Sequence, residues 1–97
     1  MSAIRPGLCS VTFRELATDE IIDLATNAGI AGIEWGADVH VKPGDLDTAR
    51  AAADRSAASG VACASYGTYL GARSPITYTA EVKKACDTAA ALGATNL

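Results

Sequence analysis

The chain lacks the features that mark several large classes of protein. Its net charge is −3 and it has no run of basic residues, so it carries no electrostatic footprint for nucleic acid. No apolar stretch approaches the length of a membrane span, and residues 1–6 contain no apolar core of a signal peptide. We therefore expect a cytoplasmic protein with no nucleic-acid and no membrane partner.

Cysteine is scarce and irregularly placed. Cys9, Cys63 and Cys86 are odd in number, far apart and without the spacing of paired metal ligands. This pattern indicates neither a disulfide framework nor a zinc knuckle. We expect all three cysteines to be small buried apolar residues.

The remaining composition is that of a small globular domain. The chain has 97 residues, of which 49% are hydrophobic and 20% charged. A single domain with a modest core is the most that this length allows.

Three segments with helical periodicity each end at a glycine. The first is expected from Thr18, a plausible N-cap, to Gly29, with an apolar face of Ile21, Leu24, Ala25 and Ala28. The second is expected from the N-cap Asp45 to Gly60, with an apolar face of Leu46, Ala49, Ala53 and Ala57. The third is expected from the N-cap Thr79 to Gly93, with an apolar face of Val82, Ala85, Cys86 and Ala89.

Short segments between these helices are typical of buried strands. We expect strands over residues 8–13, 30–35 and 61–66, and the start of a fourth strand over residues 94–97. The helix-ending glycines lie 31 and 33 residues apart, so each repeat is one βα unit.

Loop lengths favour a (β/α)8 TIM barrel. Each helix-to-strand turn is essentially one glycine, whereas the connections after the second and third strands are long, an asymmetry typical of barrels. Eight such units make roughly 250 residues, so we expect residues 1–97 to be the N-terminal part of one barrel domain, with three βα units. An open flavodoxin-like sheet is the alternative, but residues 12–15 do not supply the phosphate-binding glycine loop that it needs.

Residues 33–45 contain several of the candidate site residues of the chain. A buried strand ends there in Glu34 and Trp35, and Asp38 and the sole histidine, His40, follow. The third strand ends similarly in Tyr66, with Tyr69 beyond it. Because barrel sites form at the carboxyl ends of the strands, these residues are the candidates for substrate contact.

Three motifs follow one another in the chain: Gly32-Ile33-Glu34-Trp35-Gly36, Asp38-Val39-His40-Val41 and Ser65-Tyr66-Gly67-Thr68-Tyr69-Leu70-Gly71. In this order they resemble the N-terminal third of the sugar phosphate isomerase/epimerase family, the xylose isomerase-like TIM barrels. The resemblance implies a divalent metal (manganese, magnesium, cobalt or zinc) in the full-length protein, with ligands on later strands outside this chain. It also implies proton transfer next to the carbonyl of a small sugar or polyol-like substrate.

Each candidate residue has a functional and a structural interpretation. Glu34 would bind a substrate hydroxyl or support the metal shell, or else form a salt bridge with Arg14 or Arg73. His40 would contact substrate, or else lie exposed in a loop.

Trp35 would stack on a sugar or pack in the core, and Tyr66 would present its hydroxyl to a polyol or line the rim. Asp38 would orient His40 or shape the turn, and Arg73 would bind a phosphate or be solvated.

Two other functions remain open at this point. The chain could be a non-catalytic βα module that self-assembles through its open strand edges, which would make it a homo-oligomer. It could also belong to an endonuclease IV-like hydrolase of the same superfamily, although the single histidine and the acidic balance count against that. On the isomerase interpretation, the 97-residue chain alone would be inactive.

Overall fold

The computed structural model describes residues 4–70 and 75–97, and of residues 75–78 it describes the backbone only. The elements alternate between strand and helix, with one short 3-10 turn. They are β1 (Gly7–Cys9), η1 (Ser10–Phe13), α1 (Thr18–Ala28), β2 (Gly32–Gly36), α2 (Leu46–Ser59), β3 (Ala62–Gly67) and α3 (Pro75–Leu92).

The strands form one parallel sheet in the order β1-β2-β3. Glu34 is in register with Cys9 on one side and with Ser65 on the other. Ala64 is an extra residue in β3, because Cys63 pairs with Ile33 and Ser65 already pairs with Glu34. Beyond β3, the amide of Tyr66 donates to the carbonyl of Asn96 at 2.9 Å, so the last residues run beside the free edge of β3. They occupy the place expected for a fourth strand, although they form none.

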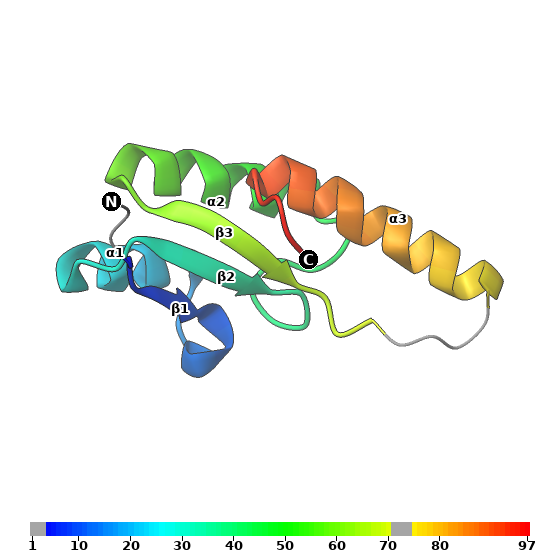
Figure 1. Ribbon diagram of the computed structural model, residues 1–97, viewed down its shortest axis with the longest axis horizontal. Helices are drawn as coiled ribbons and strands as arrows, with labels where there is room; N and C mark the ends of the chain where they lie inside the picture. The colour runs from blue at the N-terminus through cyan, green and yellow to red at the C-terminus, as the bar shows by residue number, and fades with distance from the viewer. Residues whose placement is uncertain (1–3, 71–74) are drawn as a thin grey trace.

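Helices cover only one face of the sheet (Figure 1). The core lies between that face and the helices, and its largest fully buried side chains are Trp35, Tyr66, Ile21, Ile22, Ile33 and Val41. The opposite face has no covering element among the described residues, and its alanines in β3, Ala62 and Ala64, are exposed. The sheet therefore has one apolar, packed side and one open side.

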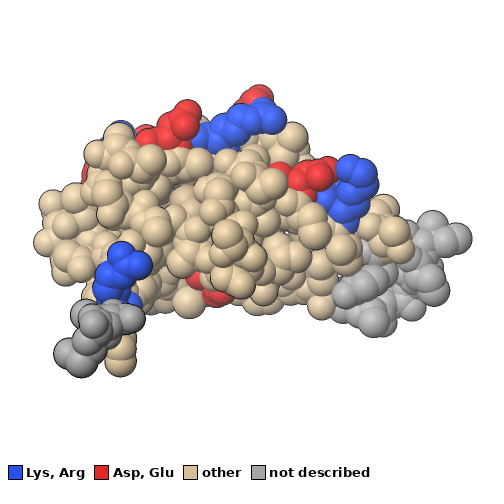
Figure 2. Space-filling view, turned by 45° about the horizontal axis from the view of Figure 1, so that its top comes forward, with Lys and Arg blue, Asp and Glu red and all other residues tan. Residues whose placement is uncertain are grey.

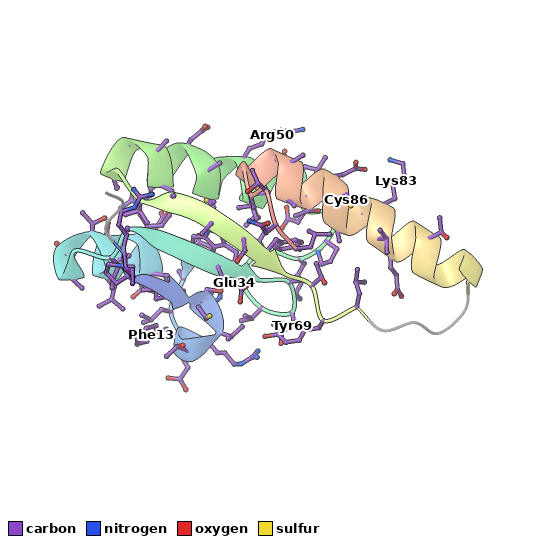
Figure 3. The ribbon with its side chains drawn as sticks, in the orientation of Figure 1. Phe13, Glu34, Arg50, Tyr69, Lys83 and Cys86 are labelled. Carbon is purple, nitrogen blue, oxygen red and sulfur yellow. The ribbon has the colours of Figure 1, made fainter. Side chains whose placement is uncertain are left out.

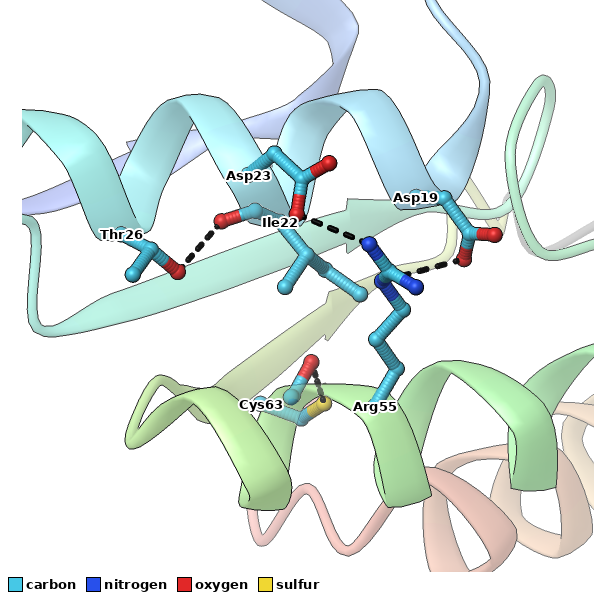
Figure 4. Close-up of polar contacts among 7 residues, drawn as sticks. Asp19, Ile22, Asp23, Thr26, Arg55 and Cys63 are labelled. Atoms are coloured by element: carbon cyan, nitrogen blue, oxygen red, sulfur yellow. Dashed lines mark hydrogen bonds and ion pairs between the residues drawn. The ribbon is translucent and has the colours of Figure 1, made fainter.

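The two N-terminal helices are also joined at their surface. Arg55 of α2 binds Asp23 of α1 through Nη2 at 2.8 Å and approaches Asp19 through Nε at 3.6 Å (Figure 4). All three side chains are substantially exposed, so solvent screens these pairs. Acidic and basic side chains are interspersed on the face shown in Figure 2, which is typical of a solvated helical surface.

The observed ends of the helices lie close to the positions predicted from the sequence. Gly29, Gly60 and Gly93 all have left-handed backbone conformations, with φ of 73°, 74° and 79°, as helix-ending glycines should. Asp45 is the N-cap of α2 and accepts from the amide of Thr48 at 3.2 Å. The N-cap of α1 is Ala17 rather than Thr18, one residue earlier than predicted.

The predicted second and third strands differ from β2 and β3 by one or two residues, and two other predicted elements are wrong by more at one boundary. The first strand ends at Cys9 and not at Phe13, because the Ser10 hydroxyl turns inward to accept from the amide of Gly36 at 2.8 Å. The third helix begins at Pro75, so Thr79 is not its N-cap. Proline suits a first helical turn, since its fixed φ is helical and its missing N–H would have no partner there.

The predicted burial also needs correction. Cys9 and Cys86 are exposed and only Cys63 is partly buried. Cys9 belongs to the strand at the sheet edge, and Cys86 lines an open groove between α3 and residues 94–97. On α1, Leu24 and Ala28 are exposed because the helix packs through Ile21, Ile22 and Ala25. On α2, Ala57 is exposed because the buried face runs through Ala49, Ala52 and Ser56.

Candidate functional site

Glu34 is the middle residue of the central strand β2 (Gly32–Gly36), two residues before its carboxyl end, and points to the open side of the sheet (Figure 3). Its neighbours Ile33 and Trp35 are fully buried, and successive side chains of a strand point to opposite faces. Glu34 itself is half-buried. The alternation of β2 thus places a carboxylate on the one face that no helix covers.

Neutral donors from both flanking strands bind this carboxylate. The Ser65 hydroxyl of β3 donates to Oε1 at 2.8 Å, and the Cys9 thiol of β1 approaches Oε2 at 3.5 Å. Burial raises the pKa of the Cys9 thiol, and the hydrogen bond and negative charge of Glu34 raise it further. The thiol therefore stays protonated near neutral pH and acts as a donor rather than a nucleophile. Cys9, Glu34 and Ser65 form a three-strand cluster, which we call the strand-end cluster.

No cation among the described residues neutralises Glu34. Arg14, one of its predicted partners, binds Asp38 at 2.8 Å. Arg73, the other, lies outside the described residues, as does any phosphate contact that it makes. A half-buried carboxylate whose donors among the described residues are all neutral keeps acceptor capacity for hydroxyl groups of a ligand.

His40 is tied into the chain through both ring nitrogens. Nδ1 lies 2.9 Å from the Ser10 hydroxyl, and Nε2 lies 2.9 Å from the carbonyl of Leu16. Its ring also meets Trp35 edge-on, with centroids 6.2 Å apart. The predicted substrate contact of His40 stays a prediction, because the ring nitrogens here bridge two loops of the same chain.

The structure places Trp35 and Tyr66 on the helix-facing side of the sheet. Both are fully buried. The indole Nε1 of Trp35 donates to the Cys63 sulfur at 3.2 Å, and the Tyr66 hydroxyl donates to the carbonyl of Val41. These contacts favour the core-packing interpretation of Trp35, and they give Tyr66 a packing role that the sequence did not predict.

Tyr69 occupies the rim position that was predicted for Tyr66. It is 65% exposed and, among the described residues, is the sole non-glycine residue with a positive φ, of 54°. Figure 3 shows it beyond β3, at the same end of the sheet as Glu34. Asp38 pairs with Arg14 rather than with His40, so it neither orients the imidazole nor acts only on its own turn.

Sequence reasoning missed Ser65 and Cys9 as partners of Glu34, and Ser10 as a partner of His40. No local signal marks Cys9, which lies near the start of its predicted strand and at the end of the observed one, or Ser65, whose face is set by the extra residue Ala64. Among residues 4–70 and 75–97, no group of three or more His, Cys, Asp and Glu side chains is placed to hold a metal ion. The strand-end cluster alone therefore does not fit a divalent metal site.

The described helices include none that is long and apolar enough to span a membrane. No known sequence family matches the chain, and no curated protein matches it closely enough to be informative.

Solved structures do share its fold. A xylose isomerase domain-containing protein from Salmonella typhimurium superposes with a TM-score of 0.76 at 12% identity, covering 97% of this chain and 36% of its own. A xylose isomerase domain protein from Alicyclobacillus acidocaldarius gives 0.69 at 19% identity, covering 95% and 34%. The chain thus has the α/β fold of the first βα units of a xylose isomerase-like TIM barrel, and it spans about a third of the length of these structures.

Proposed function

We propose that the chain forms the N-terminal part of an isomerase or epimerase of small sugars, in which Glu34 binds a substrate hydroxyl. The observation that carries this proposal is the position of Glu34, which lies two residues before the carboxyl end of the central strand β2 (Gly32–Gly36), on the open side of the sheet. In a TIM barrel, side chains at the carboxyl ends of the strands form the active site. The fold shared with xylose isomerase-like domains supports this class of substrate.

The strand-end cluster suits the binding of a polyol. Ser65 and Cys9 hold the Glu34 carboxylate from both flanking strands, so its oxygens have fixed directions before a ligand arrives. A hydrogen bond between a sugar hydroxyl and a charged carboxylate contributes about 1.5–3 kcal/mol. Pre-orientation by the flanking strands lowers the entropy lost when the substrate is positioned.

The proposed reaction is proton transfer at the carbon next to the substrate carbonyl. The residues of this chain bind and orient the hydroxyl-bearing part of the substrate, and the acid and base come from residues outside the described part. The divalent metal that the resemblance implies would likewise take its ligands there, since the described residues do not provide a set. Such a metal, when bound, would polarise the carbonyl.

Substitution Glu34→Gln in the complete protein tests the proposal. The amide keeps the size of the side chain and removes the charge, so we expect kcat/KM for the preferred aldose or ketose to fall by about 10- to 100-fold. A panel of phosphorylated and unphosphorylated pentoses and hexoses identifies that substrate. Glu15→Gln, an exposed glutamate in the loop before α1, is the matched control and should leave kcat/KM unchanged. Equal kcat/KM in wild type and Glu34→Gln would refute the substrate contact.

A further inference from the structure

We propose that His40 is a pH-sensitive clasp, which holds the segment after β1 against the loop after β2 at the edge of the candidate site. This inference does not depend on the reaction proposed above, because it concerns how two loops of the chain are held together. It rests on a continuous set of hydrogen bonds through the Ser10 hydroxyl and the His40 ring.

The direction of each hydrogen bond follows from the groups at its two ends. The Leu16 carbonyl can only accept, so His40 Nε2 must carry the proton at that 2.9 Å contact. In a neutral ring Nδ1 is then an acceptor, and the Ser10 hydroxyl, 2.9 Å away, donates to it. The Ser10 oxygen in turn accepts from the amide of Gly36 at 2.8 Å. Every polar group in the chain Gly36–Ser10–His40–Leu16 is therefore satisfied when the ring is neutral.

Protonation of the ring breaks this arrangement. Both ring nitrogens then carry a proton, and Nδ1 can only donate to the Ser10 oxygen. The hydroxyl proton of Ser10 loses its acceptor, and Ser10 is fully buried. A buried donor without a partner is unfavourable, so the Ser10 hydroxyl reorients to find another acceptor, and this loosens the bond that it accepts from the Gly36 amide.

Tight packing at Gly36 leaves the clasp little room to adjust. A Cβ atom at this position would lie 2.5 Å from Cγ1 of Val11, so η1 approaches the end of β2 closely. A shift of Ser10 therefore displaces η1 and the residues that follow it. Residues 11–16 line an open cavity of about 390 Å³, whose shape would change with that shift.

Other charged or titratable groups lie near the clasp, and none of them is a histidine. On the joined segments these are Arg14 and Asp38, which bind each other at 2.8 Å, together with the exposed Glu15 and Lys42. On the adjoining strands they are Cys9 and Glu34, which contact each other on the open side. Because His40 is the sole histidine of the chain, a response to protonation of an imidazole can be traced to one ring.

The test is an NMR titration of the ¹⁵N-labelled chain from pH 8 to pH 5. Long-range proton–nitrogen spectra of the His40 ring should show the proton on Nε2 at pH 8. As the ring gains its second proton, the hydrogen-exchange protection factor of the Gly36 amide should fall about five- to tenfold, with the same midpoint. An unchanged protection factor of Gly36 across the ring titration would overturn the proposal, as would a proton on Nδ1 at pH 8.

Two variants test whether His40, and not a neighbouring carboxylate, causes the pH response of the Gly36 amide. In His40→Gln, the amide group can accept from Ser10 and donate to Leu16 without titrating, so the pH response of Gly36 should disappear. In Asp38→Asn, the carboxylate that binds Arg14 in the same loop is neutralised, and the response should remain. Persistence of the response in His40→Gln would contradict the proposal. If that variant does not fold, the titration of the wild-type chain decides by itself.

Discussion

Replacing Tyr66 by phenylalanine tests whether this residue packs in the core or serves the substrate site. The substitution keeps the ring and removes the hydroxyl that donates to the Val41 carbonyl. Both residues are fully buried, so water cannot replace the lost donor. A buried carbonyl that loses its partner destabilises a fold by about 1–3 kcal/mol. We therefore expect the free energy of unfolding to fall by about this amount.

Thermal unfolding followed by circular dichroism measures this loss. For a domain of this size, each 1 kcal/mol lowers the melting temperature by about 4–8 °C. Tyr69→Phe is the matched control, because Tyr69 is 65% exposed and its substitution should change stability by no more than about 0.5 kcal/mol. If Tyr66→Phe were no less stable than Tyr69→Phe, the packing role of Tyr66 would be refuted and the substrate role predicted from the sequence would be favoured.

Two further predictions concern the same core. Burial raises the pKa of Tyr66 to about 12 from a usual value of 10.0, with a smaller contribution from Asp45. Because the pKa of Tyr66 is higher in the folded state, its contribution to the free energy of unfolding is complete below pH 10 and is lost as the pH rises towards 12. Denaturant titrations should show this loss in the wild type and not in Tyr66→Phe. Gly36→Ala would place a Cβ 2.5 Å from Val11 Cγ1 and should destabilise the fold by about 1–3 kcal/mol. Gly67→Ala should destabilise it less, because the nearest atom to its Cβ would be 3.5 Å away. Equal denaturation midpoints for the two alanine variants would contradict the close approach of η1 to β2.

The repeat of strand and helix could be predicted because its signals are local. A glycine that ends a helix needs only its own backbone freedom, and Gly29, Gly60 and Gly93 all lie where the spacing indicates. Asp45 caps α2 through its own side chain and the amide three residues later. Both signals act within one turn of the chain, so the sequence contains them in full.

The first strand could not be bounded in the same way, because its end depends on a distant partner. Residues 10–13 have β-branched and aromatic side chains that favour a strand, but the hydroxyl of Ser10 binds the amide of Gly36, 26 residues away. That bond fixes a 3-10 turn in place of an extended segment. A tertiary hydrogen bond therefore outweighs the strand propensity of this segment.

The candidate site could be predicted in part, through the alternation of the central strand. Ile33 and Trp35 pack against the helices, so Glu34 must face the other side. In β3 the alternation fails, because Cys63 and Tyr66 both make contacts on the helix-facing side although they are three residues apart. The extra residue Ala64 accounts for this shift, and a bulge of this kind has no signal in a single sequence. Tyr66 therefore lies on the helix-facing side, where its predicted substrate contact stays a prediction, and Ser65 was overlooked.

Solvent isotope exchange tests the central claim most directly. The complete protein is incubated with its preferred aldose or ketose in deuterium oxide, and the product is analysed by NMR for deuterium on the carbon next to the carbonyl. If the reaction is proton transfer, deuterium should appear there during turnover, because a proton removed by an enzyme base exchanges with solvent. Turnover that leaves this carbon entirely free of deuterium would contradict proton transfer and would indicate direct transfer of hydrogen within the substrate.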